Sequence, residues 1–175
     1  MTASGSPVLG ATTALASRST ADLLAGYAAT LVELRRRGVL RSNNAPAGDY
    51  GEWLIARTLA TVLSANLALK SYDLLHLDGR RVQVKTRVVS EPLTRGQLQT
   101  SVFRSFDFEL AALVQLRDVD YAVVRAVLLP VAVVRACASH VPHVNGWRLM
   151  MTPAILDHEA AEDITMVART AALTA

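Results

Sequence analysis

Apolar residues recur at helical spacing in the first part of the chain. Over residues 20–37 they return every three or four positions, which is typical of a helix that buries one face. Ser19, Thr20 or Asp22 can cap the N-terminus of this helix, and Gly38 can end it. The pattern therefore predicts a first helix over residues 20–37.

A second helix is predicted from about Tyr50 to Ser64. Residues 43–48 form a loop by composition, and Asp49 can cap the helix that follows. One stripe of this helix carries the apolar residues Ala56, Leu59 and Leu63. Glu52 lies on the same stripe, so we expect it to point toward the rest of the fold. The alternative is a carboxylate placed near the helix N-terminus because the helix dipole favours it there.

Strand-like patterns occupy the middle of the chain. Residues 69–89 are predicted to form two strands around Asp78-Gly79, which is a strong turn signal. Residues 106–116 and 120–129 are rich in Val and Leu and have the length of buried strands. The middle of the chain therefore supplies four strands in succession.

The last part of the chain alternates between the two patterns. Pro130 can start a short helix that runs through Cys137, and residues 147–151 read as a further strand. Thr152-Pro153 resembles a helix start, and we expect a C-terminal helical region to about Ala172. The complete order predicts an α/β fold with a central mixed β-sheet flanked by helices.

The turn at Asp78-Gly79 decides which side chains share a face of the sheet. Alternation puts Gln83, Lys85 and Arg87 on one face of their strand. A two-residue turn would put Asp73 on the other face, whereas a three-residue turn with a left-handed Gly79 puts Asp73 opposite Gln83. We expect the three-residue turn. The alternative use of this polar face is simple contact with solvent.

Such a face has a chemical use. The carboxylates of Asp73 and Glu52, the side-chain oxygen of Gln83 and the backbone carbonyl of Val84 are hard oxygen donors that suit Mg²⁺ or Mn²⁺. A cation held there can polarise a phosphodiester and activate a water molecule. Lys85 can orient that water and meet the negative charge that develops.

These residues resemble the PD-(D/E)XK phosphodiesterase superfamily, which has the restriction-endonuclease-like fold. The resemblance rests on an acid on a first core helix, Glu52, an Asp at one strand, Asp73, and Gln83-Val84-Lys85 on the next strand. Residues 43–52, 72–73, 78–87 and 106–110 also resemble a family of small uncharacterised bacterial proteins assigned to that fold.

The resemblance implies a Mg²⁺-dependent nuclease that hydrolyses DNA, with Asp73, Gln83, Val84 and Glu52 at the metal and Lys85 serving the nucleophile. It also implies that Asp49 can orient a water at the metal. Two residues depart from the pattern: Tyr72 replaces the usual Pro, and the neutral Gln83 replaces the usual acid. Because Gln83 removes a negative charge, cation affinity falls, and the alternative is a non-catalytic nucleic-acid-binding or assembly module.

Composition and charge are compatible with an anionic partner. Hydrophobic residues make up 51% of the chain and charged residues 19%, and the net charge is +3. Of the 18 Lys and Arg residues, only Lys70 and Lys85 are lysines. The DNA contacts predicted from the positions of basic residues are Arg37, Arg41, Arg87, Arg95 and Arg104. The high apolar content leaves room for a homodimer interface.

Other classes of protein lack support in the sequence. No apolar run reaches the roughly 20 residues of a membrane span, and no Lys or Arg precedes the apolar residues 6–16 as in a signal peptide. We expect residues 1–19 to form a flexible tail and residues 20–175 one domain. A single cysteine, Cys137, suits the cytoplasm. No P-loop or dinucleotide motif indicates a nucleotide cofactor.

Overall fold

The computed structural model describes residues 14–18, 20–41, 46–61 and 71–173. The chain divides into two compact units, residues 1–44 and residues 45–175, and each is described by itself. The predicted tail, residues 1–19, falls largely outside the described residues, although residues 14–16 are helical. None of the described helices combines the length and the apolar character needed to cross a membrane.

The first unit contains helix α2 (Thr20–Arg36), which confirms the predicted first helix. Gly38 ends it in the left-handed region with φ +73°, as its sequence position predicts. Near its C-terminus Glu33 accepts hydrogen bonds from Arg36 and Arg37, at 2.7 Å and 2.8 Å. Both arginines are thus paired with a carboxylate of their own helix.

A mixed five-stranded sheet forms the centre of the second unit, in the order β1-β2-β3-β4-β7. Its strands are β1 (Leu74–Leu75), β2 (Arg81–Val89), β3 (Leu110–Arg117), β4 (Val123–Pro130) and β7 (Glu162–Asp163). Strands β2 and β3 run parallel, and the other neighbours are antiparallel. The predicted central mixed sheet is therefore confirmed.

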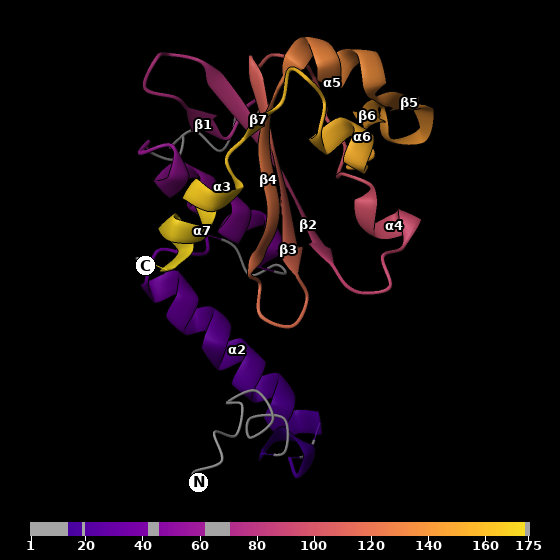
Figure 1. Cartoon of the computed structure of the whole chain (residues 1–175). Helices are drawn as coiled ribbons and strands as arrows, with labels where there is room; N and C mark the ends of the chain where they lie inside the picture. The colour runs from indigo at the N-terminus through magenta and orange to yellow at the C-terminus, as the bar shows by residue number, and fades with distance from the viewer. Residues whose placement is uncertain (1–13, 19, 42–45, 62–70, 174–175) are drawn as a thin grey trace, which may run out of the picture. The chain divides into compact units, whose positions relative to one another are not determined.

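Helices cover both faces of this sheet (Figure 1). Helices α3 (Ala47–Thr58) and α7 (Thr165–Leu173) cover one face. The other face carries α4 (Arg95–Leu98), α5 (Val131–Cys137), the hairpin of β5 (Ser139–Val141) and β6 (Gly146–Arg148) with the short helix η1 (Pro142–Val144) between them, and α6 (Pro153–Leu156). Residues 110–116 of β3 are all buried, because both faces of this central strand are covered.

Helix α3 differs from its predicted range at both ends. It begins at Ala47 after Pro46, whose fixed φ and missing N–H suit a helix start. Asp49 therefore lies inside the first turn, and its prediction as the cap is wrong. The helix ends at Thr58, and Ala60 has a left-handed φ of 49°. Residues 62–64 of the predicted helix lie outside the described residues.

The C-terminal region is helical where the prediction begins it, but it is not one continuous helical region. Helix α6 starts at Pro153 as predicted but ends at Leu156. Strand β7 interrupts the expected helical region before α7, because residues 162–163 pair with β4. The predicted strand over 147–151 is shorter, since β6 ends at Arg148.

The parallel pair β2–β3 begins at a bidentate ion pair. Arg81 Nη2 lies 2.6 Å from Glu109 Oε1, and the backbone N–H of Arg81 donates to Glu109 Oε2 at 2.7 Å. Hydrogen bonds from the Arg81 side chain, and then its backbone, lower the pKa of Glu109 from 4.5 to about 2. The ionised carboxylate thereby ties the two strand starts together.

We expect Glu109→Gln to lower the melting temperature at pH 7, because it removes this pair. A pKa lowered by folding stabilises the protein above about pH 4.5, and the effect is lost as the pH falls toward 2. The difference in melting temperature between wild type and variant should therefore shrink over that range. Thermal unfolding followed by circular dichroism at several pH values measures it, and a difference that stays constant would contradict this role.

Helix α3 lies very close to β2 at Gly51, which faces Thr86. A Cβ atom at Gly51 would overlap the Thr86 hydroxyl and lie 2.9 Å from Thr86 Cβ. Gly48, in the same helix, has open space around the equivalent position. The glycine at 51 therefore sets the distance between this helix and the sheet.

We expect Gly51→Ala to reduce the free energy of unfolding by about 1–3 kcal/mol through overpacking. Urea unfolding measures this change. Gly48→Ala is the matched control, and it should leave stability unchanged or raise it by up to about 1 kcal/mol. Adding Thr86→Ala to Gly51→Ala should recover part of the loss. Equal effects of the two glycine substitutions would contradict the close approach.

Candidate functional site

The turn between β1 and β2 has the predicted three-residue form. Leu74 pairs with Val82, and the His76 N–H donates to the Arg80 carbonyl at 2.8 Å, which leaves residues 77–79 as the loop. Gly79 is left-handed, with φ +87°. Asp73 therefore stands opposite Gln83, and this part of the prediction is confirmed.

The carboxylate of Asp73 is held against β2. Its Oδ2 accepts hydrogen bonds from Gln83 Nε2 at 2.5 Å and from the Val84 N–H at 2.8 Å. Val82 faces the same side, since its carbonyl accepts from the Asp73 N–H at 2.9 Å. The N–H and carbonyl of one strand residue point the same way, so the Val84 carbonyl is directed toward the Asp73 side of the strand.

A cavity of about 280 Å³ opens where β1 stops alongside β2. Asp73, Gln83, Val84 and Lys85 line it from the strands, and Glu52 lines it from α3. The remaining lining residues are Gly48, Ser71, Thr86, Ser101, Val102, Arg104 and Ser105. The structure thus brings the acid of the helix and the three polar residues of the hairpin to one cavity.

Lys85 is the most enclosed cation of this cavity. Only 9% of the residue is exposed, and its Nζ lies 4.9 Å from the centre of the Phe103 ring. Burial lowers the pKa of the Lys85 amine below its ordinary value, while the Asp73 carboxylate raises it and Arg104 lowers it. The ammonium is therefore a positive charge with little water around it, beside a carboxylate.

The other predicted site residues lie elsewhere. Asp49 is in the first turn of α3 and does not line the cavity. Arg87 donates to the backbone carbonyls of Gln97 and Gly96, at 3.2 Å and 3.1 Å, and so holds α4 against β2. Arg95 is exposed on α4.

Arg104 is the predicted DNA contact that lines the cavity, and its Nη1 donates to the Val144 carbonyl at 2.6 Å. Arg37 and Arg41 belong to the first unit and are exposed there. The DNA contacts of all five arginines stay predictions.

The donors around Asp73 fit a hard cation by type. No group of three or more His, Cys, Asp or Glu side chains lies close enough to hold an ion within the described ranges. Amide and backbone oxygens can also bind such an ion, and Gln83 and Val84 supply them here. Asp73, Glu52, Gln83 and Val84 all line this cavity, and carboxylate, amide and backbone oxygens are ligands that Mg²⁺ and Mn²⁺ use.

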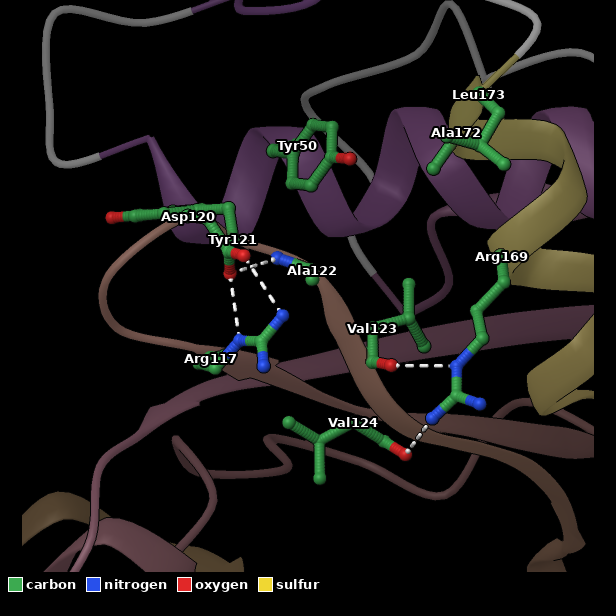
Figure 2. A pocket seen from close by; sticks show the side chains of 10 residues that line it. All are labelled: Tyr50, Arg117, Asp120, Tyr121, Ala122, Val123, Val124, Arg169, Ala172 and Leu173. Atoms are coloured by element: carbon green, nitrogen blue, oxygen red, sulfur yellow. Dashed lines mark hydrogen bonds and ion pairs between the residues drawn. The ribbon is translucent and has the colours of Figure 1, made fainter. Parts of the chain in front are cut away.

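A larger cavity of about 620 Å³ lies between the β3–β4 turn, α3 and α7, and Figure 2 shows its lining residues. The two arginines in its lining each form an ion pair or hydrogen bonds with residues of the same lining. Arg117 pairs with Asp120 at 2.8 Å, and Arg169 donates to the Val123 and Val124 carbonyls at 2.9 Å and 3.1 Å. Burial raises the pKa of Tyr50 there. The described lining contains no second carboxylate beside Asp120 and therefore no paired acids.

Sequence reasoning missed Phe103, Ser71 and Ser101 at the smaller cavity. Phe103 reaches Lys85 because its N–H and carbonyl both bond to Trp147, at 2.8 Å and 3.0 Å. This bridge joins residues far apart in the chain, and no local pattern indicates it. Ser71 precedes Asp73 closely enough to have been included with it.

Comparison with known proteins adds no relative to this description. Neither a scan against models of protein families nor a search of curated proteins found a match.

Proposed function

We propose that this protein is a metal-dependent nuclease with a restriction-endonuclease-like fold that hydrolyses phosphodiester bonds of DNA. The observation that carries the proposal is the hairpin register, which puts Asp73, Gln83 and Lys85 on one face beside a cavity. The order of elements supports it as well. Helix α3 supplies Glu52, the residue before β1 supplies Asp73, and β2 supplies the Gln-Val-Lys stretch.

The cation is assigned to the oxygens at the open edge of β2. Asp73, Gln83 and the Val84 carbonyl would hold it, and Glu52 lines the same cavity from α3. When bound, Mg²⁺ or Mn²⁺ supplies positive charge to the scissile phosphate and makes a water more acidic. The Gln83 amide turns its nitrogen to Asp73, which leaves its oxygen for the ion.

Lys85 acts on the phosphate and the attacking water. Its ammonium is enclosed, so it interacts strongly with negative charge that develops at the phosphorus. Its three donors can also orient the water. The Phe103 ring and the Asp73 carboxylate both interact favourably with this cation.

Asp73→Ala and Lys85→Ala should each reduce plasmid cleavage in Mg²⁺ or Mn²⁺ by about a hundredfold or more, because one removes a ligand and the other a charge at the reacting phosphate. The conversion of supercoiled plasmid to nicked and linear forms measures this. Asp107→Ala is the matched control, since Asp107 is exposed and outside the cavity lining. It should cleave like wild type.

Cleavage that survives in both site variants would show that these residues are not the catalytic ones. If wild type retards DNA on a gel but never cleaves it with either metal, the alternative of a non-catalytic nucleic-acid-binding module applies. The neutral Gln83 is the residue that favours this alternative.

Gln83→Glu should make stability depend more strongly on Mg²⁺. In EDTA it places a second carboxylate against Asp73 and removes a hydrogen bond, so the melting temperature should fall. A bound cation neutralises this repulsion. Adding Mg²⁺ should therefore raise the melting temperature of the variant by about 2–8 °C more than that of wild type.

The matched control for this thermal shift is Gln99→Glu, which adds the same charge at a half-buried position outside the cavity lining. Its response to Mg²⁺ should equal that of wild type. If Gln83→Glu responds no more than Gln99→Glu, the oxygens around Asp73 do not hold the ion.

A further inference from the structure

Two segments of the second unit contain no acidic residue. Residues 92–106 and 121–156 carry no Asp or Glu, although the whole chain has 15. Their arginines are Arg95, Arg104, Arg125, Arg135 and Arg148. Both segments contribute to the sheet face that carries α4, α5 and the β5–β6 hairpin (Figure 1). This face is therefore rich in positive charge.

Most of this charge is not neutralised by carboxylates. Arg125 pairs with Asp157 and Asp163, at 2.6 Å and 3.5 Å. Among the described residues, the other four arginines form no ion pair within 4.0 Å. Asp107 and Glu109, the first carboxylates after residues 92–106, interact instead with Arg81, whose pKa they raise. Such a surface favours a partner with repeated negative charges.

Aromatic rings gather on the same face. Trp147 of β6 lies 4.9 Å from Phe106 and 5.2 Å from His140 of β5, measured between ring centres. The Arg135 guanidinium of α5 lies over the Phe106 ring at 5.1 Å. His140 and Arg135 are exposed, and Trp147 and Phe106 are half-buried. Three rings and one guanidinium, from segments far apart in the sequence, thus lie together on this surface.

A buried ring and an exposed arginine connect this aromatic and basic surface to the candidate site. Phe103, whose ring faces Lys85, lies 6.4 Å from Phe106. Arg104 lines the cavity and also donates to Val144, close before β6. Arg104 therefore links the cavity to the segment just before the strand that carries Trp147.

We propose that this surface, formed by Arg104, Phe106, Arg135, His140 and Trp147, binds single-stranded nucleic acid. Bases would stack on the accessible faces of these rings, and phosphates would contact the arginines. A duplex hides the faces of its bases within the stack, so rings of this kind would add nothing to its binding. The inference rests on the proposed function in so far as it names the substrate class, namely unpaired strands that reach the Asp73 cavity.

The test is binding of fluorescein-labelled dT15 to the full chain in EDTA, where no cleavage occurs, measured by anisotropy at low salt. Arg135→Ala should weaken binding about fivefold to tenfold and reduce the salt dependence. Arg57→Ala is the matched control. Arg57 also lies 5.1 Å over an aromatic ring, Trp53, but on the opposite face of the sheet. It should change the affinity less than twofold.

A second readout is tryptophan fluorescence. The chain has two tryptophans, so Trp53→Phe leaves Trp147 as the only source of tryptophan emission. Saturating dT15 should quench its emission in that variant, and His140→Ala should weaken the dT15 affinity. The proposal is overturned if Arg135→Ala and Arg57→Ala weaken binding equally, if the emission does not change at saturation, or if a 15-base-pair duplex binds as tightly as dT15.

Asp73→Asn separates this inference from the nuclease proposal. If no metal gives cleavage while wild type and Asp73→Asn bind dT15 equally, the nuclease proposal fails and the surface stands. If wild type cleaves DNA but shows no preference for dT15, the surface proposal fails and the nuclease stands.

Discussion

The turn between β1 and β2 determines which side chains meet. Its three residues end in a left-handed Gly79, and the ladder above it then pairs Leu74 with Val82. Because side chains alternate along a strand, one residue more or fewer in this turn would send Asp73 to the face covered by α3. The hydrogen bonds from Gln83 and Val84 to its carboxylate exist only in the observed register.

The two faces of β2 have opposite environments, and this difference isolates the polar cluster. On one face Thr86 packs directly against Gly51 of α3. On the other face Lys85 lies beneath Phe103. The cavity joins these environments at the strand edge, which allows Glu52 from the helix layer to face a cluster that belongs to the opposite layer.

Local sequence patterns predicted the first two helices, strands β1 to β4 and the hairpin register, but not β7 or the long-range contacts. The periodicity in residues 20–37 and the apolar strands 110–117 and 123–130 specify structure by themselves. Helix α3 starts earlier than predicted because Pro46 favours a helix start there. The C-terminal region differs from its prediction because residues 162–163 pair with the distant strand β4. The bridge from Phe103 to Trp147 depends on tertiary contacts, so neither the neighbour of Lys85 nor the aromatic surface could be read from spacing.

The brevity of β1 has a consequence for the backbone of its neighbour. A partner strand that continued one more pair would cover the edge of β2 with ladder hydrogen bonds and hide the main-chain oxygen of Val84. Ending the ladder at Leu74 lets an aspartate side chain take the place of the missing strand. The same edge that would otherwise invite another strand is thereby turned into a place where small ions and water can approach peptide oxygens.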